Sequence, residues 1–81
     1  MSKNEIGERL RALREEAGQT KRFLAKAVDC SYTSICAYEY GDRVPSDRMK
    51  IRLAEHFHKT VGEIFFPDEN HETRTDHDEV R

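Results

Sequence analysis

Two cysteines and four histidines are the side chains of this sequence with the most potential for covalent or metal chemistry. His56 and His58 lie two residues apart at the end of an expected helix, so their rings point in different directions. His71 and His77 lie near the C-terminus among acidic neighbours. Because no metal-ligand spacing and no pairing of a nucleophile with a base appears, we expect no metal, no cofactor and no enzymatic activity.

The cysteines, Cys30 and Cys36, are too few for a disulfide-stapled secreted domain and favour a reducing cytoplasm. Cys30 falls where a small buried hydrophobe is expected. Cys36 falls on a more exposed face, and a redox switch there would need an accessible thiol of low pKa. The sequence has no apolar run of 18 residues that would span a membrane. We expect no signal peptide, because no apolar stretch follows the first residues, Met-Ser-Lys-Asn-Glu.

The chemistry that the sequence does offer is hydrogen bonding and apolar contact from one short helix. This helix is expected over residues 32–40, with Ile35 and Tyr38 turned inward. Its opposite face carries Tyr32, Thr33, Ser34, Cys36 and Ala37. Most of these side chains are short, so this surface is suited to entering a groove.

Helix signals recur through residues 6–66 and strand signals are absent, which predicts a compact all-α domain of five short helices. The first helix has an apolar stripe formed by Ile6, Leu10, Leu13 and Ala17. The later helices begin after N-capping side chains, namely Thr20, Ser31, Ser46 and Thr60. Helices are expected to end at Gly18, Gly41 and Pro67.

The helices expected at residues 21–28 and 32–40 are so close in the chain that they must cross at a steep angle. Ala25 is the small residue that such a crossing needs. Asp29 is expected at positive φ, which it tolerates better than most residues. The first of these helices has Phe23, Leu24, Ala27 and Val28 as its apolar members.

The composition separates two parts of the chain. Hydrophobic residues are 36% and charged residues 37% of the whole. Residues 1–66 carry 12 Lys and Arg against 10 Asp and Glu, whereas residues 67–81 carry 2 against 6. We expect a mildly basic domain over residues 1–66, followed by an acidic, solvated tail that serves either as a passive terminus or as a protein-binding segment.

An ordered set of residues over the whole expected domain carries a resemblance to a known family. The set is Ile6-Gly7-Glu8-Arg9-Leu10-Arg11, Ala17-Gly18-Gln19-Thr20, Leu24-Ala25, Ser31, Ile35, Tyr38-Glu39-Tyr40-Gly41, Arg43, Pro45-Ser46, Leu53-Ala54 and Glu63-Ile64-Phe65. It resembles the lambdoid repressor/Cro helix-turn-helix family, also called the xenobiotic-response-element (XRE) type. The chain departs from the usual pattern of that family at Gln19, Lys21, Phe23, Asp29, Lys50 and His56.

The resemblance implies a lambda-repressor-like fold that binds double-stranded DNA as a homodimer, with helix 32–40 in the major groove. Contacts to bases are expected from Tyr32, Thr33, Ser34 and Ala37, beside the helix cap Ser31. Lys21 and Arg43 are expected to contact phosphates. Matching positions in relatives form an ion pair, which is expected here between Arg14 and Glu39.

A dimer needs apolar surface that the monomer does not use. Ile64-Phe65-Phe66 is the best candidate, because three consecutive residues of a helix cannot all face one core. We expect Ile64 and one phenylalanine to point inward, and the other phenylalanine, alongside Val61, to contact the second copy.

These observations favour a transcriptional regulator, most often a repressor in this family, that binds a palindromic operator in the cytoplasm. The alternative is an antitoxin that binds DNA and neutralises a basic protein partner with its acidic tail.

Overall fold

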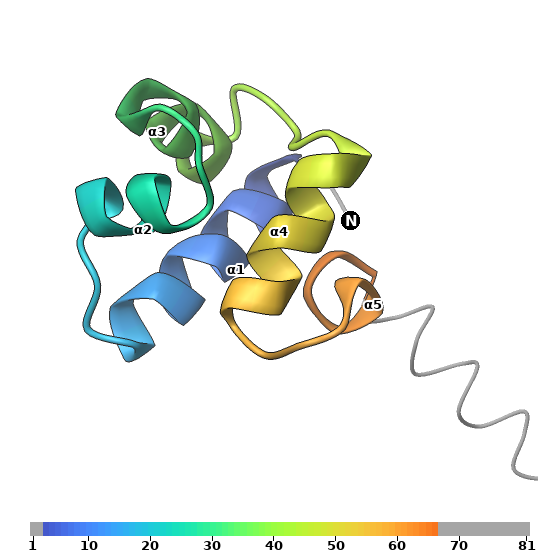
Figure 1. The fold of residues 1–81 in the computed structure, drawn as a ribbon. Coiled ribbons are helices and arrows are strands. Elements are labelled where there is room, and N and C mark those ends of the chain that lie inside the picture. The colour runs from blue at the N-terminus through green and yellow to red at the C-terminus, as the bar shows by residue number, and fades with distance from the viewer. Residues whose placement is uncertain (1–2, 67–81) are drawn as a thin grey trace, which may run out of the picture.

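The computed structural model describes residues 3–66, and all regular structure in that range is helical. The helices are α1 (Lys3–Glu16), α2 (Lys21–Ala27), α3 (Tyr32–Tyr40), α4 (Asp47–His56) and α5 (Val61–Phe65). In Figure 1, α1 runs through the middle of the domain, with α2 and α3 toward one side and α4 and α5 toward the other. The predicted all-α fold is therefore confirmed. The expected acidic tail, residues 67–81, lies outside the described residues.

Each of the later four helices begins at a serine or threonine whose side-chain oxygen accepts a backbone N–H three residues later. These caps are Thr20, Ser31, Ser46 and Thr60. At Thr60 the hydrogen bonding is reciprocal and forms a capping box, because Glu63 Oε1 also accepts from the N–H of Thr60 at 2.8 Å. Such caps contribute about 1 kcal/mol each, which matters for helices too short to be stable alone.

The core lies where all five helices meet. Its most deeply buried side chains are Leu10, Leu24, Ile35, Leu53, Ile64 and Phe65. Every helix supplies at least one of them, α3 packs against α1 and α2, and α5 packs against α1 and α4. Within residues 3–66, none of the helices has the length and apolar character that a membrane crossing requires.

The buried stripe of α1 differs from the prediction at its C-terminal end. Ala17 is exposed, because α1 ends at Glu16 and Ala17 lies in the turn that follows. Leu13 is half-buried, and Arg14 takes the buried position instead. A charged residue in the core face of a small domain needs a partner there.

Arg14 has that partner in Glu39, so the ion pair expected between α1 and α3 is present. Arg14 Nε donates to Glu39 Oε2 at 2.7 Å, and Nη2 donates to Oε1 at 3.1 Å. Nη1 donates to the carbonyl oxygen of Gln19 at 2.8 Å. The hydrogen bond to Glu39 raises the pKa of Arg14 above its ordinary value, against the opposing effect of burial. One guanidinium thus joins α1, the turn before α2, and α3.

The same two helices approach closely at Gly7. A Cβ atom on Gly7 would lie 2.5 Å from the carbonyl oxygens of both Tyr38 and Glu39, a distance that real Cβ atoms do not adopt. Glycine therefore allows the backbone of α1 to rest on the end of α3, near the carboxylate that Arg14 binds.

Replacing Glu39 by alanine should leave the buried Arg14 guanidinium without its carboxylate. We expect Glu39→Ala to lower the free energy of unfolding by about 3 kcal/mol, measured by urea denaturation followed by circular dichroism. The control is Arg11→Ala, which removes an exposed pair with Glu15 (3.3 Å) and should cost less than about 1 kcal/mol. Equal losses in the two variants would contradict a structural role for the buried pair.

Candidate nucleic-acid interface

The turn between α2 and α3 is held by a close backbone contact. The N–H of Cys30 donates to the carbonyl oxygen of Ala25 at 2.9 Å, and Ala25 is buried at the crossing of the two helices. Asp29 has a φ of 62°, in the left-handed region that the sequence predicted for it. The crossing fixes α3 so that one face packs inward and the other faces solvent.

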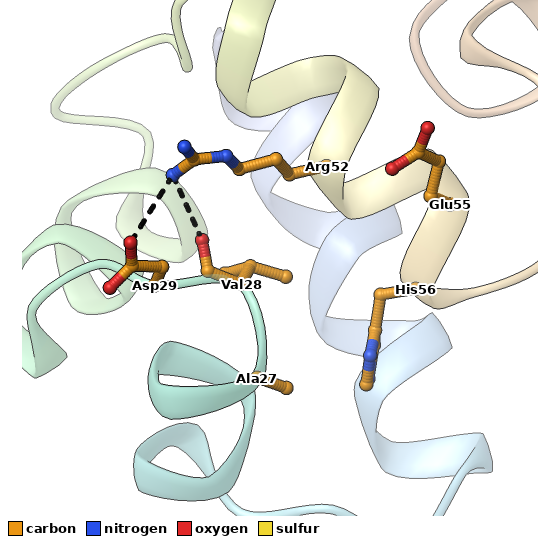
Figure 2. A pocket seen from close by; sticks show the side chains of 6 residues that line it. All are labelled: Ala27, Val28, Asp29, Arg52, Glu55 and His56. Atoms are coloured by element: carbon orange, nitrogen blue, oxygen red, sulfur yellow. Dashed lines mark hydrogen bonds and ion pairs between the residues drawn. The ribbon is translucent and has the colours of Figure 1, made fainter.

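α4 supports the same turn from the side. Figure 2 shows Arg52 reaching from α4 to the turn, where Nη1 lies 3.4 Å from the carbonyl oxygen of Val28 and 3.9 Å from Oδ2 of Asp29. The hollow beside these contacts, about 450 Å³ in volume, is also lined by Ala27, Glu55 and His56. Sequence reasoning did not identify Arg52, because its partners lie far away in the chain and no motif links them.

The outward face of α3 presents the side chains that the sequence assigned to it. Tyr32 and Thr33 are exposed, whereas Ser34, Cys36 and Ala37 are half-buried. The accessible residues of α3 therefore lie at its two ends, with Tyr32 and Thr33 at the start and Tyr40, 66% exposed, at the end. Thr33 is exposed and has a short side chain with both a hydroxyl and a methyl group.

Arg43, in the loop after α3, folds back along that helix. Its Nη2 donates to Ser34 Oγ at 2.8 Å, and its guanidinium carbon lies 5.4 Å from the ring centre of Tyr38. The hydroxyls of Ser34 and the cap Ser31 are themselves hydrogen-bonded at 2.9 Å. The structure thus brings together three residues that the sequence had given separate roles.

Two further cations lie over tyrosine rings at the two ends of α3. Lys21 Nζ is 5.0 Å from the ring centre of Tyr40, the last residue of α3. The guanidinium carbon of Arg22 is 4.6 Å from the ring centre of Tyr32, the first residue. Lys21 and Tyr32 were expected at the DNA interface, whereas the sequence indicated no such role for Arg22 or Tyr40, since charge and aromatic character at helix ends do not show which side chains pair.

The residues expected at a dimer interface divide into two groups. Ile64 and Phe65 have no exposed surface and belong to the core, whereas Phe66 is 38% exposed and Val61 is half-buried. Lys50 Nζ lies 5.1 Å from the ring centre of Phe66 and 5.7 Å from that of Phe65. In the folded monomer, Phe66 is therefore the member of this group that is available to a second copy.

Three of the positions where the chain departs from the family pattern lie together. His56 Nε2 and Gln19 Oε1 are 2.8 Å apart, and the rings of Phe23 and His56 are tilted with centres 6.4 Å apart. Phe23 was expected among the apolar members of α2 but is 56% exposed, and Ala27 is exposed as well. Both are on the outer face of α2, because Leu24 and Ala25 occupy its inner face.

The cysteines and histidines show no arrangement for metal binding in the described part of the chain. No group of three or more His, Cys, Asp or Glu side chains within residues 3–66 is placed to hold a metal ion. Both cysteines are free thiols, and burial raises the pKa of the Cys30 thiol. Cys30 packs against the core, in the role that the sequence predicted.

A comparison with protein families identifies the fold. Residues 5–63 match the family model described as a helix-turn-helix domain. The chain belongs to the XRE, or lambda-repressor-like, helix-turn-helix family. It is similar to the HTH-type transcriptional regulator DicA of Escherichia coli (strain K12), with 35% identity over 65 residues. The matched region covers 80% of this chain and 48% of DicA, about half of that relative's length. No solved structure matches the chain significantly.

The helix-turn-helix depends on the left-handed backbone at Asp29, which alanine and glycine substitutions can test. Asp29→Gly and Asp29→Ala both remove the carboxylate near Arg52, but only alanine keeps a Cβ at positive φ. We expect the glycine variant to be more stable than the alanine variant by about 1 kcal/mol in urea denaturation.

Asp42, exposed and outside the left-handed region, provides the control, and glycine should bring no advantage over alanine there. If Asp29→Ala were as stable as Asp29→Gly, the turn would have a different backbone in solution.

Proposed function

We propose that this protein is a sequence-specific DNA-binding transcriptional regulator that binds its operator as a homodimer, with α3 in the major groove. The observation that carries the proposal is the start of α3, where Tyr32 and Thr33 are exposed and Arg43 reaches Ser34, while Lys21 lies over Tyr40 at the other end of the helix. Helices of this kind insert their N-terminal residues against base edges. Membership of the helix-turn-helix family and the similarity to DicA support the same function.

Base recognition is assigned to the outward side chains of α3. The Thr33 hydroxyl can hydrogen-bond a base edge, and its methyl group can pack against the methyl of thymine. Ala37 offers apolar contact alone. Ser34 holds Arg43 at 2.8 Å, so its hydroxyl acts on DNA together with that guanidinium rather than independently.

Phosphate contacts are assigned to Lys21 and Arg43, each of which lies over a tyrosine ring. Residues 1–66 have a net charge of only +2, so a broad positive electrostatic field is not the source of the affinity for DNA. Affinity then depends on a few well-placed cations and on the pairing of two domains.

A homodimer follows from the small size of one recognition helix, which contacts too few base pairs for tight specific binding. Two-fold symmetry would give a palindromic operator, with one half-site for each copy. Repression is the effect we propose, because it is the commonest action of regulators of this type. The comparisons give no support to the antitoxin alternative, and no observation within residues 3–66 favours it.

The division between phosphate and base contacts can be tested by alanine substitution. Lys21→Ala and Arg43→Ala should weaken binding to all duplexes alike and reduce the slope of log affinity against log salt by about one unit for each lost contact. Thr33→Ala should instead lose discrimination at one base position, by about 1–3 kcal/mol.

The operator would first be selected from a random duplex pool, and affinities then measured by fluorescence anisotropy at several salt concentrations. Arg11→Ala, which removes a positive charge from the exposed face of α1, should leave sequence preference unchanged. An unchanged preference in Thr33→Ala would show that the base-contacting face lies elsewhere.

Phe66 tests the dimer. A carboxylate at this exposed position should oppose burial against a second copy, so Phe66→Asp should lower the dimer fraction in sedimentation velocity while the helical circular dichroism is retained. Phe23→Asp, at an exposed phenylalanine on α2, is the matched control and should leave the dimer fraction unchanged. A dimer that survives Phe66→Asp would place the interface away from Phe66.

A further inference from the structure

Arg22 is an exposed cation of α2 and, like Lys26, has no role in the proposed function. Its guanidinium carbon lies 4.6 Å from the ring centre of Tyr32. Tyr32 is the first residue of α3 and is 42% exposed. Although Arg22 belongs to the first helix of the motif, its charged group therefore lies at the N-terminal end of the second helix, where base contacts are made.

The surface around this pair is concave. Arg22 and Tyr32 line an open hollow of about 510 Å³, together with Arg14, Gln19, Thr20 and Lys21. The guanidinium of Arg14 is already bonded to Glu39 and to the carbonyl oxygen of Gln19. The free cationic groups of the hollow are therefore those of Lys21 and Arg22, and Lys21 Nζ lies over Tyr40 at the other end of α3.

The contact with Tyr32 leaves the hydrogen-bonding capacity of Arg22 intact. A guanidinium over an aromatic ring is attracted to the ring face, and the N–H donors at its edge stay available to another partner. Two such donors side by side match the O6 and N7 acceptors of guanine in the major groove, the commonest specific contact of arginine with DNA. Because the ring restrains the side chain before binding, less conformational entropy is lost on contact.

We propose that Arg22, positioned by the Tyr32 ring, recognises a guanine at one position of each half-site. This inference rests on the proposed function, since it requires α3 to lie in the major groove. It makes Arg22 a specificity-determining residue and Tyr32 its positioning residue. Lysine is a weaker substitute for Arg22 in this role, because its ammonium lacks the planar, fixed pair of donors that matches the guanine edge.

The test compares sequences selected from a random duplex pool by the full chain and by variants. The wild type and Tyr32→Phe, which retains the ring, should select a guanine at one position of each half-site. Arg22→Lys and Tyr32→Leu should both lose that preference by about 5- to 100-fold on the selected site. Arg22→Lys should keep the salt slope of the wild type, since its charge is unchanged. Arg11→Lys, the matched change on α1, should keep both the guanine and the slope.

Two results would overturn the inference. If Arg22→Lys selected the same guanine as the wild type, or weakened binding to all sequences alike, Arg22 would contact a phosphate instead. If Tyr32→Leu kept the guanine while Arg22→Lys lost it, the ring would not position the guanidinium. A wild-type protein that enriched no sequence would instead contradict the proposed function itself, so the two failures are distinguishable.

Discussion

The buried pair of Arg14 and Glu39 is the contact on which the orientation of α3 depends. The guanidinium of Arg14 donates to both oxygens of Glu39 and to the carbonyl of Gln19, so it fixes α1, the start of the helix-turn-helix and the recognition helix relative to one another. A hydrophobic contact at this place would stabilise the domain but would allow α3 to rotate or slide. The two-pronged hydrogen bond restricts α3 in direction as well as in distance. Gly7 completes the constraint, because it lets α1 lie against the end of α3.

A recognition helix fixed in this way can have a small inward face. Ile35, Tyr38 and Glu39 are the buried residues of α3, so only three of its nine side chains are needed to hold it against the rest of the domain. Because few residues of α3 are buried, the helix also has to be anchored through the turn that precedes it. A backbone hydrogen bond from the N–H of Cys30 to the carbonyl oxygen of Ala25 stabilises this turn. Arg52 of α4 donates a further hydrogen bond to the carbonyl oxygen of Val28 in the turn. The inner face of α3 thus anchors the helix, and its outer face remains accessible.

The elements of the fold could be predicted from the sequence, because they depend on local rules. Serine or threonine caps begin four helices, glycine ends two segments, and Asp29 adopts the positive φ expected of it. The error at Ala17 has a local cause as well, since periodicity alone could not show that α1 stops one residue earlier. Arg14 was expected in an ion pair through a family resemblance, and hydropathy alone would have placed it in solvent.

The side-chain pairs of the candidate interface could not be predicted in the same way. Arginine and lysine have several rotatable bonds, so where their charges lie depends on rings and carbonyls brought near by the fold. The spacing of residues in the sequence does not predict that Arg43 pairs with Ser34. It does not predict the pairing of Arg22 with Tyr32 either. The cluster of Gln19, Phe23 and His56 is a further example, because the fold brings His56 at the end of α4 close to Gln19 and Phe23, which are far from it in the chain.

Because the net charge of the domain is small, the positions of the cations that pair with tyrosine rings matter for DNA binding. With only 2 positive charges in excess over residues 1–66, non-specific attraction to phosphate is weak, and the ratio of specific to non-specific binding is set by where individual cations lie. Three of them, Lys21, Arg22 and Arg43, lie over tyrosines that belong to α3 itself. Their positions are consequently tied to the recognition helix rather than to the helices or loops that supply them. Any change that moves α3 moves these charges with it, so the three cations and the exposed face of α3 keep their relative positions.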